Sequence, residues 1–307
     1  IILMGGESID GTSTRLNDVW CSTDKGVNWT EMTSAAPWTA RTDFSAVALP
    51  DDSIVLMAGF DTSGRHNDVW RSTDKGSTWI EQTAAASWTG RTGCGAVALS
   101  DGAIVLMGGV VGFDSKQNDV WRSTDQGATW TQMTASAPWD ARMVGSALAM
   151  PDDSIILFGG RTDSSLKDDI WRSTDQGATW TQITDNASWP ERISFEAVAT
   201  FQGDIIAMGG ESNGRKNDVW RSMDFGVTWI QLTPAAEWPA RGGFAAVSLP
   251  DHSIVIMGGY GGGNDAWRLD TAQSHEANPS HTYTTPGTYD VTLEYLAGDV
   301  TLTLTTP

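Results

Sequence analysis

Residues 120–139 read V-W-R-S-T-D-Q-G-A-T-W-T-Q-M-T-A-S-A-P-W and carry three tryptophans at a constant step of nine residues. Fifteen of the 16 tryptophans fall into five such triplets, and Trp267 begins a sixth triplet that is not completed. The triplets are Trp20/Trp29/Trp38, Trp70/Trp79/Trp88, Trp121/Trp130/Trp139, Trp171/Trp180/Trp189 and Trp220/Trp229/Trp238. Successive triplets begin 50, 51, 50 and 49 residues apart. A period of this length is typical of propellers, solenoids and other repeat arrays.

Each period predicts four short strands, which we call A to D. In the third period, residues 94–99 form a small apolar run that ends at the turn signal S-D-G, and residues 104–107 form a continuous apolar run that ends at G-G. Residues 119–123 then alternate like a half-buried strand, and residues 129–133 pair back after a tight turn. Helical periodicity is absent, so the sequence predicts an all-β chain.

Four antiparallel strands repeated in this way predict the blade of a β-propeller. One small sheet cannot bury both of its faces, whereas sheets stacked around an axis cover one another, with Trp supplying bulk and Gly permitting close approach. Strand B ends in a pair of small residues six times, at Gly5-Gly6, Ala58-Gly59, Gly108-Gly109, Gly159-Gly160, Gly209-Gly210 and Gly258-Gly259. We therefore expect a six-bladed propeller of four-stranded antiparallel blades over residues 1–269. By the strand inventory, its first blade lacks strand A and its sixth lacks strand D.

Two motifs within the period resemble known repeat families. An apolar strand that ends in two glycines and is followed by N-D-V-W, as at residues 67–70, 118–121 and 217–220, resembles the kelch repeat. The pattern S-x-D-x-G-x-x-W occurs five times and resembles the Asp-box, or BNR repeat, of the sialidase-like propellers. The resemblance implies a structural turn at the periphery, built by Asp24, Gly26, Trp29, Asp74, Gly76, Trp79, Asp125, Gly127, Trp130, Asp175, Gly177, Trp180, Asp224, Gly226 and Trp229.

Residues 270–307 depart from the period. The stretches N-P-S-H-T-Y at 278–283 and P-G-T-Y-D-V-T-L at 286–293 resemble the C-terminal half of a PKD domain, an Ig-like β-sandwich. Because fewer than forty residues are covered, we expect a short β-hairpin tail with strands at 288–296 and 300–305 rather than a complete sandwich. One hypothesis places this hairpin beside an open blade edge. The alternative is that the chain is a fragment whose closing strands lie upstream.

Composition excludes several classes of function. The chain has 38 acidic and 19 basic side chains, a net charge of −19 and a pI near 4.3, so a nucleic-acid partner is not expected. No apolar run approaches the ~20 residues needed for a membrane span. The two cysteines form no disulfide framework, and without a Cys/His cluster we expect no metal and no cofactor. The chain opens at Ile1 without a signal segment, so an extracellular or cell-surface location is implied by resemblance alone.

The candidate ligand-binding residues lie mainly in two sets of loops. In an antiparallel blade the B–C and D–A loops share one face, whereas the A–B turns and the Asp-box turns share the other. Basic residues recur in the B–C loops, and acidic residues recur in the A–B turns, so the two faces are expected to differ in charge. The alternative is that all of these are solvated loop charges. The B–C loop candidates are Arg65, His66, Lys116, Arg161, Arg215 and Lys216, to which Arg15 and Lys167 are similar.

A second set of arginines follows the third tryptophan of each triplet by three residues. Because they recur in every period, we interpret them as structural, as cations stacked on or bonded beside the D–A loop. The alternative is a ring of arginines near one mouth that would bind a carboxylate or sulfate. The residues are Arg41, Arg91, Arg142, Arg192 and Arg241.

Three further candidates depart from the repeat. Asp43 and Glu196 stand in the second and fifth periods, where other periods have small or apolar residues, and six-fold geometry would place them opposite one another. Paired carboxylates would suit glycoside hydrolysis, whereas the plainer interpretation is that each pairs locally with an arginine. Tyr260 is the only tyrosine outside the tail and hence the only candidate for a sialidase-like nucleophile.

These observations predict a monomeric propeller that binds a protein or glycan partner without catalysis, through the B–C and D–A loops. No catalytic residue is assigned, because no glutamate is obviously placed to activate Tyr260 and no histidine cluster can be assembled. The alternatives are a sialidase-like glycoside hydrolase and a purely structural cell-surface spacer. The identity of the ligand is not indicated by the residues.

Overall fold

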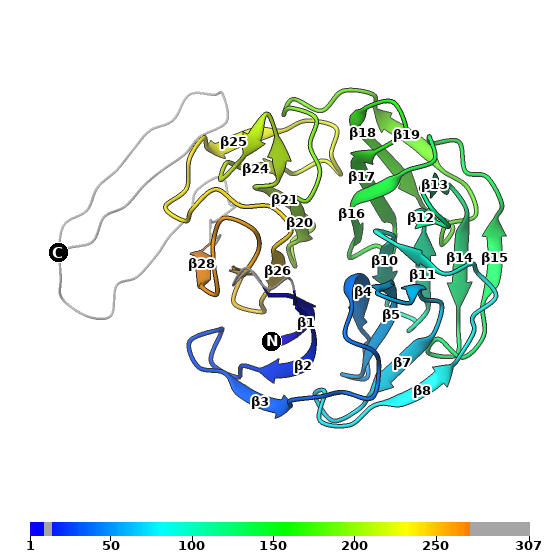
Figure 1. Cartoon of the computed structure of the whole chain (residues 1–307). Helices are drawn as coiled ribbons and strands as arrows, with labels where there is room; N and C mark the ends of the chain where they lie inside the picture. Colours follow the sequence, from blue (N-terminus) through cyan, green and yellow to red (C-terminus); the bar gives the residue numbers. More distant parts are fainter. Residues whose placement is uncertain (9–13, 271–307) are drawn as a thin grey trace, which may run out of the picture. The chain divides into compact units, whose positions relative to one another are not determined.

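The computed structural model describes residues 1–8 and 14–270, and these contain antiparallel sheets and no helix. The main sheets are arranged as blades around a central axis (Figure 1). This confirms the all-β, kelch-type propeller that the tryptophan spacing predicts. No described segment could cross a bilayer as an apolar helix.

Each blade runs from its innermost strand outward in chain order. Blades 1 and 2 consist of β1 (Ile2–Glu7), β2 (Arg15–Cys21) and β3 (Thr30–Thr33), and of β4 (Thr42–Ala48), β5 (Ile54–Asp61), β7 (Val69–Ser72) and β8 (Ile80–Thr83). Blades 3 and 4 consist of β10 (Gly95–Ala98), β11 (Ile104–Met107), β14 (Val120–Ser123) and β15 (Thr131–Thr134), and of β16 (Met143–Ala149), β17 (Ile155–Arg161), β18 (Leu166–Ser173) and β19 (Thr181–Thr184). Blades 5 and 6 consist of β20 (Glu196–Ala199), β21 (Ile205–Met208), β24 (Val219–Ser222) and β25 (Ile230–Thr233), and of β26 (Ala245–Ser248), β27 (Ser253–Met257) and β28 (Ala266–Asp270). Short strands extend the loops of the second, third and fifth blades: β6 (Gly64–Arg65), β9 (Arg91–Thr92), β12 (Val110–Val111), β13 (Ser115–Lys116), β22 (Glu211–Ser212) and β23 (Gly214–Arg215).

The second strand of each complete blade is apolar throughout because neighbouring blades cover both of its faces. In blade 3 all four residues of β11 are buried, and the strand stops at Gly108 and Gly109, whose φ angles are 62° and 95°. A Cβ at Gly109 would lie 2.9 Å from the carbonyl oxygen of Thr92. Glycine is therefore required at position 109 both by the left-handed backbone and by the close approach of the neighbouring strand β9.

The nine-residue tryptophan step places indoles from successive blades in contact. The third tryptophan of one triplet packs against the second tryptophan of the next triplet: the Trp38 and Trp79 rings lie 6.0 Å apart at 85°. The same edge-to-face pair recurs at the next three blade junctions, as Trp88–Trp130, Trp139–Trp180 and Trp189–Trp229. Such pairs add packing energy beyond the burial of apolar area, so they hold neighbouring blades together.

The first and last blades are incomplete in the described residues. Blade 1 consists of β1–β2–β3 and lacks an innermost strand, whereas blade 6 consists of β26–β27–β28 and lacks an outermost one. Both features agree with the strand inventory of the sequence. The predicted hairpin and PKD-like segment, including Tyr283, Tyr289 and Tyr295, lie outside the described residues.

Candidate functional site

Side-chain contacts confirm which loops share a face. Thr39 of the first D–A linker lies 3.4 Å from the His66 ring in the B–C loop of blade 2. On the other side of the blades, Gln126 of an Asp-box turn bonds to Asp51 of the A–B turn in blade 2. We call the face of the B–C loops and D–A linkers the loop face, and the face of the A–B turns and Asp-box turns the turn face.

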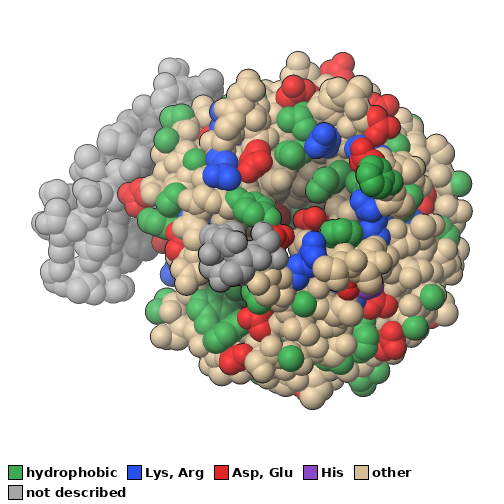
Figure 2. Space-filling model, viewed as in Figure 1, with side chains coloured by type: hydrophobic (Ala, Val, Ile, Leu, Met, Phe, Trp, Pro, Cys, Tyr) green, Lys and Arg blue, Asp and Glu red, His purple; other side chains and the backbone are tan. Residues whose placement is uncertain are grey.

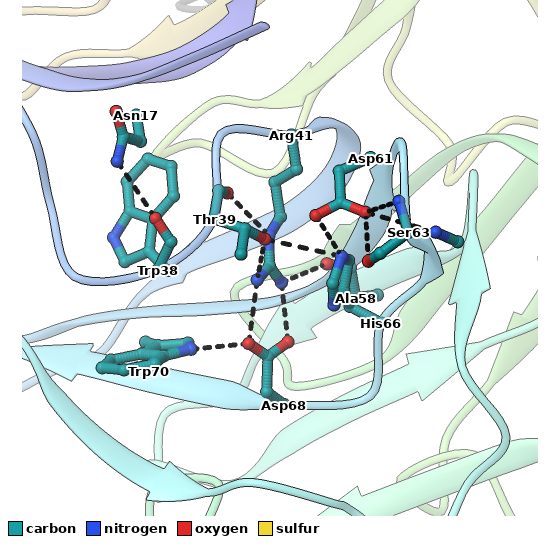
Figure 3. A network of polar contacts seen from close by, with 11 residues as sticks. Asn17, Trp38, Thr39, Arg41, Ala58, Asp61, Ser63, His66, Asp68 and Trp70 are labelled. Carbon is teal, nitrogen blue, oxygen red and sulfur yellow. Dashed lines mark hydrogen bonds and ion pairs between the residues drawn. The ribbon is translucent and has the colours of Figure 1, made fainter.

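The five arginines that follow the tryptophan triplets are buried inside the blades. Arg41 donates to both oxygens of Asp68, at 2.6 and 2.8 Å, and to the carbonyl of Ala58 at 2.9 Å (Figure 3). None of the five arginines is more than 2% exposed. The same pairing recurs as Arg91–Asp119, Arg142–Asp169, Arg192–Asp218 and Arg241–Asp265. The geometry therefore agrees with the structural interpretation and leaves no arginine ring open to a carboxylate or sulfate ligand.

Asp68, Asp119 and Asp218 are held in their charged form. Burial alone would raise the pKa of Asp119, but the hydrogen bonds and the charge of Arg91 outweigh burial and hold this pKa below its usual range. The same holds for Asp68 and Asp218: burial would raise their pKa values, but the hydrogen bonds and charges of Arg41 and Arg192 outweigh burial and lower them. Each pair thus combines a bidentate ion pair with charge-assisted hydrogen bonds inside the blade.

The S-x-D-x-G-x-x-W segments form the turns that their residue chemistry predicts. In blade 2, Ser72 Oγ donates to Asp74 and accepts from the Gly76 amide at 2.8 Å. Asp74 accepts from the backbone and side chain of Thr78, and Trp79 Nε1 donates to the Gly76 carbonyl at 3.0 Å. Polar groups of the turn are thus bonded within it, which favours a structural role for the segment.

Some basic side chains of the loop face are neutralised by neighbouring acids. Lys116 pairs with Asp114 and Asp163 at 3.1 and 2.7 Å, and Arg215 pairs with Glu211 at 3.3 Å. His66 is likewise fixed on Asp61, at 2.9 Å. Three candidates form no ion pair with any described residue: Arg65, Arg161 and Lys216.

Acidic side chains of the turn face are likewise paired with basic ones. Asp51 pairs with Arg71 at 2.7 Å, and Asp152 pairs with Arg172 at 2.6 Å. Figure 2, which shows the loop face, has basic and acidic side chains intermixed around the centre. The charge difference predicted between the two faces is therefore much smaller than the residue types indicate.

An aromatic and cationic row crosses the loop face from blade 1 to blade 3. The guanidinium groups of Arg15 and Arg65 lie 4.9 and 5.6 Å from the centre of the Phe60 ring. Arg65 also donates to the carbonyl of Gly112, next to Phe113, whose side chain is fully exposed. We call Arg15, Phe60, Arg65 and Phe113 the aromatic–arginine row. Neither phenylalanine was predicted as a site residue, although Phe113 stands in a B–C loop and Phe60 lies near the end of β5, just before one.

Of the remaining candidates, Asp43 and Glu196 lie on the innermost strands β4 and β20, and Tyr260 lies in the B–C loop of blade 6. Arg41 and Arg192 are occupied by Asp68 and Asp218, so neither of these arginines is available to the two carboxylates. Burial raises the pKa of Glu196 to about 8. Burial of the Asp43 carboxylate and the negative charge of Glu7 raise the pKa of Asp43. Neither carboxylate is among the groups that shift the pKa of the other, so the geometry gives no support to a catalytic carboxylate pair.

Tyr260 lies among acidic groups. Its side chain is 45% exposed, and its pKa is raised by burial and by the charges of Glu7, Asp43 and Glu211. A tyrosine nucleophile is activated by an adjacent general base or by a lowered pKa. The pKa of Tyr260 shifts in the opposite direction. Among the described residues there is also no group of three or more His, Cys, Asp or Glu side chains with the geometry of a metal site.

The comparison with protein families gives one result. The family model described as the KLHDC2/KLHL20/DRC7 Kelch-repeats domain matches residues 94–287, which is more than half of the chain. No curated protein matches the sequence. The match supports the resemblance drawn from the double glycines and N-D-V-W. It does not test the resemblances to Asp-box propellers or to PKD domains.

Proposed function

Because the chain belongs to the kelch-repeat family, we propose that it is a non-catalytic propeller that binds a protein partner through its loop face. Kelch domains typically bind proteins. The observation that carries the choice of face is the aromatic–arginine row, in which a fully exposed Phe113 adjoins Arg65. Aromatic residues and arginine are enriched among the residues that dominate binding energy at protein interfaces.

The row is suited to binding because three of its four side chains, those of Arg15, Phe60 and Arg65, are already held in place. Phe60 is held between Arg15 and Arg65, and Arg65 is fixed by the backbone of the next blade. Little side-chain entropy would therefore be lost when a partner covers these residues. Arg65 and Arg161 also have no acidic partner among residues 1–8 and 14–270, so an acidic group of the partner would supply their first ion pairs.

The test is a binding screen of the 307-residue chain against immobilised proteins and glycans. For a protein ligand of the loop face, we expect at least tenfold weaker binding by Phe113→Ala and by the triple variant Arg65→Glu, Arg161→Glu and Arg215→Glu. The controls are Phe201→Ala and Lys75→Glu, which remove an exposed ring and reverse a positive charge on the turn face. Both control variants should bind the ligand as the wild type does. Unchanged binding by the triple variant would contradict the proposal.

A glycan ligand and an extracellular or cell-surface location are the finer parts of the prediction. The exposed rings of Phe113 and Tyr260 would support sugar stacking as well as protein contact. If only glycans of the screen bind the wild-type chain, and Phe113→Ala no longer binds them, the glycan ligand is favoured over the protein ligand. The glycosidase alternative finds no support in the geometry, because the arginines it needs are occupied by aspartates and the pKa of Tyr260 is raised.

A further inference from the structure

The B–C loop of blade 5 is a short hairpin, β22–β23, with a fixed base and an open tip. At the base, the backbone of Glu211 exchanges two hydrogen bonds with Ile193, at 2.8 and 3.0 Å. At the tip, Asn213 and Gly214 are both exposed. A Cβ at Gly214 would meet nothing within 4 Å apart from its own chain neighbours, so no other part of the protein covers the tip.

The tip carries an Asn-Gly sequence. Asn213 is the only asparagine of the chain that is followed by glycine, because the other eight precede Asp, Trp, Ala or Pro. Its side-chain amide has no hydrogen-bond partner among the described residues. The amide of the exposed Asn28, in contrast, donates to Asp24 at 2.6 Å. Four further asparagine amides donate to backbone carbonyls of the blade linkers: Asn17, Asn67, Asn118 and Asn217.

An unrestrained Asn-Gly pair can react with itself. The backbone nitrogen of Gly214 attacks Cγ of Asn213, a five-membered succinimide ring closes, and the side-chain nitrogen leaves as ammonia. Water then opens the ring at one of its two carbonyl carbons, which gives either aspartate or isoaspartate. One water is consumed and one ammonia is released, with no change of oxidation state. Glycine favours ring closure because it has no Cβ to hinder the attacking nitrogen and because its backbone is conformationally permissive.

The new carboxylate would lie on the loop face, close to two cations. Arg215 follows Gly214 directly and pairs with Glu211 at 3.3 Å, and Lys216 forms no ion pair with any described residue. A negative charge added beside them competes with Glu211 for Arg215 and lowers the positive potential of this part of the loop face. Isoaspartate also lengthens the main chain at the tip, which alters the pairing of Ser212 with Gly214.

We propose that Asn213 is a site of spontaneous deamidation, which converts it to aspartate and isoaspartate and makes the loop face of blade 5 more acidic with time. The reaction needs no reagent other than water, and both reacting groups belong to the tip of the hairpin. The site itself is independent of any partner. Its consequence for binding an acidic group of a partner rests on the proposed function.

The test is a peptide map of the full 307-residue chain during incubation at pH 8 and 37 °C. Trypsin releases residues 193–215 as a peptide in which Asn213 is the single asparagine. Mass spectrometry measures conversion of the amide to the acid, and electron-transfer fragmentation separates aspartate from isoaspartate. We expect Asn213 to convert roughly tenfold or more faster than Asn28 and Asn264, which precede Trp and Asp. Conversion should be slower at pH 6, because the attacking nitrogen reacts in its deprotonated form.

Two variants at the same position are the matched controls. Asn213→Gln would have to close a six-membered ring, which forms far more slowly, so the incubated variant should gain no acidic form at this site. Asn213→Asp carries the new charge from the start. On an anion-exchange column, the acidic form that appears in the incubated wild type should elute with Asn213→Asp. Appearance of the same form at an equal rate in Asn213→Gln would assign it to another residue and overturn the proposal.

A synthetic peptide of residues 209–218 tests whether the folded hairpin permits the reaction. Because the tip is open, Asn213 of the full chain should convert at a rate within about tenfold of the rate in the peptide. A slower rate in the full chain, or equal conversion at Asn28 and Asn264, would contradict the proposal. These measurements use no binding partner, so this test and that of the proposed function fail independently.

Discussion

At the scale of single residues, blade 4 departs from a contact that recurs in blades 1, 2, 3 and 5. The side-chain amides of Asn17, Asn67, Asn118 and Asn217 each donate to two backbone carbonyls of the linker that follows their blade, an arrangement we call the asparagine clamp. Asp168 occupies the register of Asn118 and Asn217, and its carbonyl still accepts from the Ala187 amide at 3.1 Å. A carboxylate cannot donate to the two linker carbonyls, as the amide of asparagine does. Burial, with the charges of Glu191, Asp169 and Asp185, raises the pKa of Asp168. This site is therefore a local weakness in the repeat.

We expect Asp168→Asn to increase the free energy of unfolding by about 1 kcal/mol at pH 7, because it restores the clamp and removes an unfavourable charge. A raised pKa means that the folded state favours the protonated acid, so the gain should shrink as the pH falls through this pKa. Urea denaturation at pH 7 and pH 4 measures both effects. Asp185→Asn removes a nearby exposed charge without touching the clamp, and an equal gain from this control would contradict the explanation.

Glu196 gives a second prediction of pH dependence. Its pKa of about 8 means that the folded state is most stable with Glu196 protonated, and stability is lost as the pH rises from the unfolded value towards 8. Glu196→Gln should therefore raise the free energy of unfolding by about 1–3 kcal/mol at pH 9 and leave it unchanged at pH 4. The exposed Glu31→Gln is the matched control in urea denaturation, and a gain that is the same at both pH values would refute the assignment.

Residue types alone could identify the recurring arginines as structural but could not find their partners. Arg91 and Asp119 are 28 residues apart in the sequence, at the end of the linker into blade 3 and at the start of its third strand, so no local pattern joins them. Exposure is equally hard to infer, since nothing in the sequence distinguishes the exposed Phe113 from the partly covered Phe60. Both properties depend on how neighbouring blades approach one another.

At the scale of elements, the buried ion pairs join the inner end of one blade's linker to the third strand of the next blade. Removing one partner leaves a charge inside the protein without compensation. This costs far more than breaking an exposed pair. The chain contains both kinds, because Lys167 and Asp140 pair at the surface at 2.7 Å.

We expect Asp119→Asn to lower the free energy of unfolding by about 3–5 kcal/mol at pH 7. Asp140→Asn, the same change in the exposed pair, should cost less than about 1 kcal/mol. Since the pKa of Asp119 is lowered in the folded state, its contribution is present above the unfolded pKa and is lost as the pH falls. The gap between wild type and Asp119→Asn should therefore narrow at pH 3, as measured by thermal unfolding, and a gap that widened would contradict this account.

The strands themselves were the most predictable elements. The apolar runs that end in two small residues mark the second strand of each blade, and the S-x-D-x-G-x-x-W turn marks the hairpin that follows the third. The short loop strands such as β12 and β13 were not predicted, because pairs of two residues carry no periodic signal. The positive φ of Asp43, 52°, was likewise not predicted, although the equivalent position holds glycine in blades 3 and 6, at Gly93 and Gly243.

At the scale of the whole propeller, the tryptophan spacing predicted the blade repeat and the strand inventory predicted the incomplete first and last blades. The partners across each blade junction could not be predicted in the same way, because they meet only when neighbouring blades are brought together.

Hydrogen exchange should distinguish the incomplete blade from the complete ones. In β28 only one edge pairs with a described strand, whereas β14 is paired on both edges. We expect alternate amides of β28 to exchange as fast as unprotected amides, while the amides of β14 exchange many times more slowly. Mass spectrometry or NMR at neutral pH measures this, and full protection of β28 would mean that its outer edge is paired.

The indole pairs at four blade junctions also make the intrinsic fluorescence of the protein a gauge of its integrity. Because each pair is shared by two blades, separation of a junction would bring two indoles into water together and shift their emission to longer wavelength.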